Sequence, residues 1–205
     1  AKVVSNLITN AGASRVVTVD LHAGQIQGFF DIPVDNLFTT PMFARYIKKK
    51  FKTKNLVCVS PDVGGVQRTR GLATKIKADL AIIDKRRPEP GKSKVMNIIG
   101  DVKGKNCIII DDIIDSGGTI INAVDALKKA GAVEVYVFIT HAVLSGDAIK
   151  RIKNSRIKKL IITDTIDNSQ KIKNNNKIEV LSISSLMSEA IKRIANSNSV
   201  SDLFN

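Results

Sequence analysis

Short, almost continuous hydrophobic runs alternate along the chain with longer segments whose hydrophobic residues recur at helical spacing. The runs that predict strands lie at 15–20, 56–60, 80–84, 94–100, 107–112, 133–141, 158–164 and 178–182. The segments that predict helices lie at 2–10, 41–50, 65–77, 119–129, 147–153 and 186–195. Strands that are hydrophobic on both faces and alternate with helices are typical of a mainly parallel sheet covered by helices on both sides. The pattern therefore predicts an α/β fold, which binds its ligands beyond the carboxyl ends of the strands.

Composition and charge narrow the possible partners. Of the 205 residues 43% are hydrophobic, so a core of aliphatic side chains needs no disulfide or metal. The net charge is +13, but the lysine-rich segments 45–54 and 150–159 are typical of solvated helix faces and ends. We therefore expect a phosphorylated small molecule rather than nucleic acid. No hydrophobic run approaches the roughly 18 residues of a membrane span, which predicts a cytoplasmic protein with no membrane partner.

The two cysteines lie in strand-like runs, away from any motif that would give them a partner. Cys58 belongs to the run 56–60 and Cys107 to the run 107–112. Free Cys is among the most buried residue types in folded proteins. We predict that both are buried free thiols.

The segment CIIIDDIIDSGGT, residues 107–119, carries the sharpest chemical signal. A buried strand brings Asp111 and Asp112 toward its carboxyl end, and the residues Asp115, Ser116, Gly117, Gly118 and Thr119 then open a helix. Glycines allow close backbone approach, and a helix N-terminus favours an anion. This pattern suits a sugar phosphate, with the phosphate in the loop and the hydroxyls on the two carboxylates. The alternative is an ordinary strand-to-helix turn with acidic capping residues.

Two further turns repeat parts of this chemistry. SPDVGGVQRTRG, residues 60–71, is again a strand, an acid (Asp62), two glycines and a helix. The alternative for this segment is a tight strand-to-helix turn with Arg68 and Arg70 on the helix surface. DKRRPEPGKSK, residues 84–94, follows a strand, and Lys85 and Arg87 point the same way in an extended segment. These two cations could clamp a polyphosphate and stabilise charge that develops on a transferred group. The alternative interpretation is a solvated basic loop.

The segment DLHAGQIQGFFDIPVD, residues 20–35, places His22 beside several carboxylates just after a strand. His22 could be a metal ligand, a donor to phosphate or a structural histidine. Asp20, Asp31 and Asp35 are acidic enough to hold Mg²⁺ directly or through water. The residues by themselves leave these possibilities open.

Taken together and in this order, the four segments resemble those of ribose-phosphate diphosphokinases, also called 5-phosphoribosyl 1-diphosphate (PRPP) synthetases, of the bacterial-like phosphate-dependent class. The resemblance extends to about residue 195 and implies a phosphoribosyltransferase-like fold. It also implies transfer of the diphosphoryl group of Mg-ATP to the 1-hydroxyl of ribose 5-phosphate, which gives PRPP and AMP for nucleotide biosynthesis. ATP is then a co-substrate, Mg²⁺ the cofactor, and the assembly a homo-oligomer, commonly a hexamer.

The resemblance also implies roles for individual residues. Lys85 and Arg87 become catalytic, and His22 and Asp62 become magnesium-site residues, with Asp20, Asp31 and Asp35 as further metal candidates. The acidic pair and residues 115–119 would bind ribose 5-phosphate.

The same resemblance predicts the domain organisation. Residues 1–40 would be a remnant of a preceding, similar domain, residues 41–195 the ribose-phosphate-binding domain, and residues 196–205 a polar tail. The family's adenine-nucleotide-binding residues would precede this sequence, so we expect the chain alone to bind ribose phosphate with little synthetase activity. Two alternatives stay open: a type I phosphoribosyltransferase, which shares residues 111–119 but not the 20–35 segment, and a non-catalytic subunit associated with a synthetase.

Overall fold

The computed structural model of the chain describes residues 1–51, 55–86 and 95–204, with residues 85, 86, 95 and 204 described by their backbone only. The chain divides into two compact units. Unit 1 consists of Ala1–Pro41 together with Ile183–Asn205, and unit 2 is Met42–Ser182. Unit 2 begins at Met42, and the predicted second domain began at residue 41. The predicted second domain, however, ended at residue 195, whereas the structure groups the last helix with the N-terminal segment.

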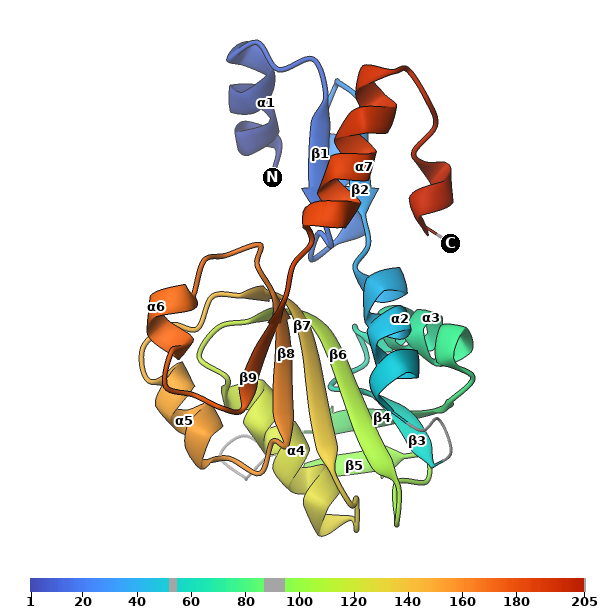
Figure 1. Cartoon of the computed structure of the whole chain (residues 1–205), viewed down its shortest axis with the longest axis vertical. Helices are drawn as coiled ribbons and strands as arrows, with labels where there is room; N and C mark the ends of the chain where they lie inside the picture. The colour runs from blue at the N-terminus through green and yellow to red at the C-terminus, as the bar shows by residue number, and fades with distance from the viewer. Residues whose placement is uncertain (52–54, 87–94, 205) are drawn as a thin grey trace. The chain divides into compact units, whose positions relative to one another are not determined.

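Unit 2 is built on a seven-stranded sheet of order β5-β4-β3-β6-β7-β8-β9 (Figure 1). The described strands are β3 (Leu56–Ser60), β4 (Asp79–Arg86), β5 (Val95–Ile99), β6 (Asn106–Ile114), β7 (Val135–Ala142), β8 (Lys159–Thr163) and β9 (Ile178–Leu181). Neighbouring strands are parallel except β4 and β5, which are antiparallel. After β3 the chain adds β4 and β5 on one side, and then β6 and the later strands on the other. The order thus reverses between β3 and β6, which is where such sheets bind ligands.

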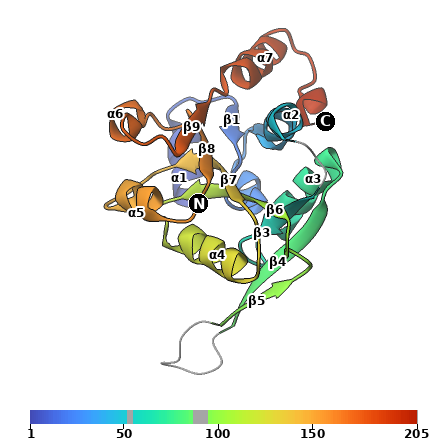
Figure 2. The ribbon, with the colours of Figure 1, turned by 60° about the horizontal axis from the view of Figure 1, so that its bottom comes forward.

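Helices cover both faces of this sheet, as predicted (Figure 2). α2 (Thr40–Lys50) and α3 (Val66–Ile76) contribute to one hydrophobic cluster. α4 (Gly118–Lys129) and α5 (Ala148–Asn154) contribute to the other, and the short α6 (Ser169–Ile172) follows β8. The predicted α/β class with a mainly parallel sheet is confirmed.

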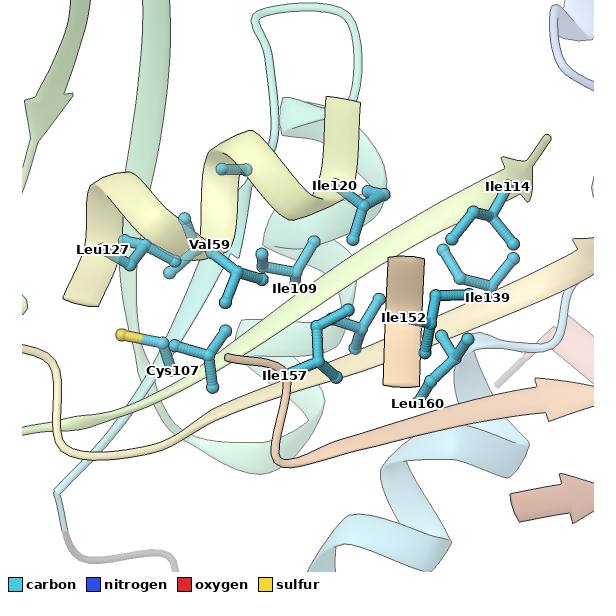
Figure 3. Close-up of a cluster of buried hydrophobic side chains, with 14 of the residues drawn as sticks. Val59, Cys107, Ile109, Ile114, Ile120, Leu127, Ile139, Ile152, Ile157 and Leu160 are labelled. Carbon is cyan, nitrogen blue, oxygen red and sulfur yellow. The ribbon is translucent and has the colours of Figure 1, made fainter. Parts of the chain in front are cut away.

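Strand β6 supplies both clusters because successive side chains of a strand point to opposite faces. Ile109 packs with Val59, Ile120 and Leu127 on the side of α4, as Figure 3 shows. Ile108 and Ile110, the residues before and after Ile109, belong to the cluster that α2 and α3 cover. This burial on both faces anchors the strand that carries the acidic pair.

The two cysteines are buried free thiols, as predicted. They lie on adjacent strands, since Cys58 of β3 is paired with Ile108 and Cys107 of β6 with Val57. Cys58 packs in the cluster with α2 and α3, and Cys107 in the cluster with α4 and α5, so the two side chains point to opposite faces. Burial raises the pKa of each thiol to about 12.

Unit 1 contains η1 and β2 between residues 20 and 41, where the hydrophobic pattern predicted no element. Its elements are α1 (Lys2–Asn10), β1 (Val16–Val19), the 3₁₀ helix η1 (Gly24–Phe29), β2 (Val34–Leu37), α7 (Ser184–Ala195) and the 3₁₀ helix η2 (Ser201–Phe204). β1 and β2 form a parallel pair in which Val16 lies opposite Val34. None of the described helices combines the length and the hydrophobicity needed to cross a membrane.

Candidate ribose-phosphate site

The turn from β3 into α3 is held by short hydrogen bonds among its own residues. The Ser60 hydroxyl donates to the carbonyl of Asp62 at 2.6 Å, and the Asp62 carboxylate accepts the backbone N–H of Gly65 at 3.1 Å. A Cβ atom on Gly65 would lie 2.9 Å from Ser60 Oγ, closer than side chains approach. The second glycine of SPDVGG is therefore required by the tightness of the turn, which places α3 directly after β3.

Asp111 and Asp112 lie near the carboxyl end of β6, the strand next to β3. The strand continues past them to Ile114, beyond its predicted end at residue 112. Arg68, in the first turn of α3, reaches both carboxylates: its Nη1 lies 3.0 Å from Asp111 Oδ1 and 3.1 Å from Asp112 Oδ1. The exposed fractions of the side chains are 18% for Asp111, 3% for Asp112 and 19% for Arg68. One cation therefore bridges two largely buried carboxylates across the point where the sheet order reverses.

The surroundings of the acidic pair shift the titration of Asp111. Burial, followed by the neighbouring Asp112, raises its pKa to about 7, while Arg68 opposes the shift. A carboxyl group that titrates near neutral pH is typical of functional sites. At neutral pH this pair can both accept hydrogen bonds from hydroxyl groups and change its charge.

Five residues after Asp111, the chain forms a candidate anion-binding turn. Gly117 has a φ of 77°, a backbone conformation that favours glycine, and α4 begins at Gly118. No side chain caps this helix, so its first N–H groups and its dipole can act on a ligand. Ser116 and Thr119 are exposed and add hydroxyl groups at the same end. The arrangement suits a phosphate group beside the two carboxylates.

The predicted metal residues of the 20–35 segment all belong to unit 1. The Asp20 carboxylate is buried and accepts hydrogen bonds from the backbone and hydroxyl of Thr39. Asp31 pairs with Lys2 and Asp35 with Arg15. His22 is exposed in the turn after β1. The structure thus gives the three carboxylates separate partners.

Asp62, the remaining predicted metal residue, belongs to unit 2. In the part of the chain that the structure describes, no three His, Cys, Asp or Glu side chains gather as a metal site would require. The metal assignments of His22, Asp62, Asp20, Asp31 and Asp35 therefore stay predictions.

Lys85 and Arg87 are the predicted catalytic pair. The backbone of Lys85 lies near the end of β4, opposite Met96 of β5 in the antiparallel hairpin. Arg87 lies outside the described residues. The structure therefore supplies the strand that leads into this segment, and the roles of the two side chains stay predictions.

Arg68 is the residue of this site that the sequence interpretation missed, since only the alternative interpretation mentioned it, on the helix surface. Its position contains a usable signal. Arg68 lies four residues before Leu72 and eight before Ile76, both of which are buried, so it belongs to the stripe of α3 that faces the sheet. Arg70 lies off that stripe and is exposed.

Comparison with known proteins agrees with this geometry. Residues 85–205 match the family of the phosphoribosyl synthetase-associated domain. The chain belongs to this family. The matched segment includes the acidic pair and the anion-binding turn, whereas Asp62 and Arg68 precede it. Membership confirms the resemblance that the four sequence motifs carried.

Relatives of this phosphoribosyl synthetase-associated family extend the match to the whole chain. A ribose-phosphate pyrophosphokinase of Brucella melitensis is 59% identical over 204 residues, which cover 100% of this chain and 66% of the relative. One from Bradyrhizobium diazoefficiens is 58% identical and is covered to 64% of its length. The crystal structure of phosphoribosylpyrophosphate synthetase from Mycobacterium smegmatis matches with a TM-score of 0.88 and 38% identity. That match covers 96% of this chain and 64% of the other, so the chain spans less than two thirds of these proteins.

Proposed function

We propose that this chain is the ribose-phosphate-binding part of a ribose-phosphate diphosphokinase, which forms PRPP and AMP from ribose 5-phosphate and ATP for nucleotide biosynthesis. The observation that carries the proposal is the acidic pair Asp111 and Asp112 beside the uncapped N-terminus of α4. Both lie where the order of the parallel sheet reverses. The names of the relatives supply the reaction, and the site supplies a binding mode for its sugar substrate.

Each half of ribose 5-phosphate has a matching group in this site. Vicinal hydroxyls donate hydrogen bonds to carboxylates, which accept through both oxygens. The 5-phosphate accepts hydrogen bonds from the first N–H groups of α4 and from the hydroxyls of Ser116 and Thr119. The proposal assigns Asp115, Gly117 and Gly118 to the same phosphate turn.

ATP would bring Mg²⁺ with it. Magnesium in nucleotide sites is usually held by one or two carboxylates, the substrate phosphates and water, so a three-ligand protein cluster is not needed. We propose Asp62 of unit 2 as a protein group that approaches this ion and His22 of unit 1 as a separate magnesium-site residue, and we rank Asp20 lowest of the metal candidates because its buried carboxylate already binds Thr39. Bound to ATP, the ion would neutralise phosphate charge.

The proposed reaction needs no covalent intermediate on the protein. The 1-hydroxyl oxygen of the sugar bonds to the β-phosphorus of ATP, the bond from that phosphorus to the α-phosphate oxygen breaks, AMP leaves, and the hydroxyl proton is released. Catalysis of such transfers consists mostly of positioning and of stabilising charge. We assign the first task to residues 111–119 and the second to Lys85 and Arg87. A cytoplasmic homo-oligomer, as the family resemblance implies, completes the proposal.

Two measurements on the 205-residue chain test this function. Isothermal titration calorimetry with ribose 5-phosphate should show binding, with inorganic phosphate as the control ligand that lacks the sugar. Phosphorus NMR of the chain with ribose 5-phosphate and Mg-ATP should show little PRPP and AMP, because the chain spans only 66% of the Brucella relative. Absence of ribose 5-phosphate binding would overturn the binding assignment. Rapid formation of PRPP would contradict the expectation of low activity for this chain alone.

A further inference from the structure

Arg68 connects the two turns that meet at the reversal of the sheet. It belongs to the helix after β3, and its guanidinium contacts carboxylates that belong to β6. We propose that Arg68 is a positioning residue for sugar recognition: it holds Asp111 and Asp112 side by side and favours the ionised form that accepts the ribose hydroxyls. This inference rests on the proposed function and adds a residue to which no role was assigned.

The need for a cation follows from the charges. Two adjacent carboxylates in a largely buried place repel each other, and at least one then binds a proton unless a positive charge lies nearby. A protonated carboxyl group donates one hydrogen bond and loses part of its capacity to accept. Arginine stays protonated at any physiological pH, so its charge is always present.

The geometry of the contact orients the pair. Arg68 Nη1 approaches Oδ1 of both residues. Asp111 Oδ1 also accepts the backbone N–H of Asp112 at 3.0 Å, which fixes the rotation of the Asp111 carboxylate. The contact therefore fixes one oxygen of each carboxylate.

If the role of Arg68 were purely structural, it would hold α3 against β6 and have no effect specific to the sugar. The two roles can be distinguished by changing the ligand. A positioning residue that acts through the carboxylates changes the energy of the hydroxyl contacts, whereas a clamp changes the stability of the fold. A ligand that keeps the phosphate but loses one hydroxyl, 2-deoxyribose 5-phosphate, reports the difference.

The test compares Arg68→Gln with Arg70→Gln, which removes the same charge from an exposed position two residues along the same helix. For Arg68→Gln we expect the affinity for ribose 5-phosphate to fall about tenfold or more, because a charged hydrogen-bond partner of a buried pair is lost. The loss for 2-deoxyribose 5-phosphate should be smaller. Arg70→Gln should stay within about twofold of the original chain for both ligands. Arg68→Lys keeps the charge and should recover part of the affinity.

Each outcome bears on one idea. If the original chain binds ribose 5-phosphate and Arg68→Gln binds it like Arg70→Gln, the inference is wrong and the proposed function stands. Equal losses for both sugars also overturn the inference, because the effect is then not mediated by the hydroxyl contacts. If Arg68→Gln does not fold, the comparison of both sugars is made with Arg68→Lys, for which a larger loss for the ribose is expected. If the original chain binds neither sugar, the proposed function itself fails.

Discussion

The candidate metal carboxylates of unit 1 and the acidic pair of unit 2 are arranged in opposite ways. In unit 1, Asp20, Asp31 and Asp35 each have their own partner, namely Thr39, Lys2 and Arg15. In unit 2, Asp111 and Asp112 share the single nitrogen Nη1 of Arg68. The pairs of Asp31 and Asp35 neutralise charge near the surface, whereas the shared cation of unit 2 keeps two like charges together.

The difference shows what a carboxylate needs in order to serve a ligand. A carboxylate with a partner of its own is satisfied, and binding a ligand there would break an existing contact. The pair in unit 2 is crowded, and burial and the neighbouring carboxylate raise the pKa of Asp111 to about 7. Hydrogen bonds from sugar hydroxyls would stabilise the two carboxylates. For this reason we propose the crowded pair, and not the carboxylates of unit 1, as the sugar-binding site.

The largest expected effect comes from neutralising one member of the crowded pair. Asp112→Asn keeps the size of the side chain but replaces one carboxylate oxygen with a donor. The affinity for ribose 5-phosphate, measured by calorimetry, should fall about 100-fold because a buried charged acceptor is lost. Asp35→Asn is the matched control in unit 1 and should change the affinity by less than about twofold. Equal effects of the two variants would remove the contrast between the units.

A stability effect should appear at Asp20, a buried carboxylate of unit 1. Asp20 has a φ of 44° and accepts two hydrogen bonds from Thr39. Asp20→Ala should lower the free energy of unfolding by about 2 kcal/mol, since a buried donor pair loses its acceptor. Asp20→Asn, which keeps an acceptor and tolerates positive φ, should cost less. Denaturant unfolding measures both, and equal stability of the Ala variant would show that these bonds contribute little.

The pH dependence of binding tests the crowding directly. Because the pKa of Asp111 is raised to about 7, the carboxyl is mostly protonated at pH 6 and mostly ionised at pH 8. The affinity for ribose 5-phosphate should therefore rise over this range, by up to about tenfold. Asp111→Asn should remove this component and leave only the titration of the ligand's own phosphate. An identical pH profile for the variant would show that Asp111 does not titrate in this range.

The smallest effect is expected at the surface pair of Arg15 and Asp35. Arg15 donates to Asp35 at 2.6 Å, and the exposed fractions of the side chains are 40% for Arg15 and 14% for Asp35. Ion pairs that solvent reaches from one side contribute little to stability because water and salt screen them. Arg15→Gln should leave the unfolding midpoint unchanged within error. A clear loss of stability would show that this ion pair contributes to the free energy of unfolding, as is expected of Asp20.

The strands of unit 2 could be predicted from the sequence where both of their faces are buried, because the run of hydrophobic residues is then continuous. β3 was predicted with its observed ends, Leu56 and Ser60, because all of its residues are buried. β2, Val34–Leu37, was not predicted, because Asp35 and Asn36 interrupt its hydrophobic run. The domain assignment of α7 failed for another reason. An amphipathic pattern indicates that a helix has a buried face but not which part of the chain covers it.

The candidate site also has one part that the sequence predicts and one part that it does not. The acidic pair and the phosphate turn are contiguous in the sequence, so spacing alone indicated them. The contact with Arg68 joins residues 43 and 44 positions apart, and it depends on the strand order that places β3 beside β6. Local patterns carry no information on that order.

Cys58 and Cys107 can serve as intrinsic probes of local opening in the two hydrophobic clusters of unit 2. The two thiols lie on neighbouring strands but in different layers, and a pKa near 12 keeps the reactive thiolate scarce while they are buried. Each can then be alkylated only when its own layer opens. Single-cysteine variants would give two separate labelling rates, one for the side of α2 and α3 and one for the side of α4 and α5. Ligand binding at the edge of the sheet could be followed from inside each layer without any added probe.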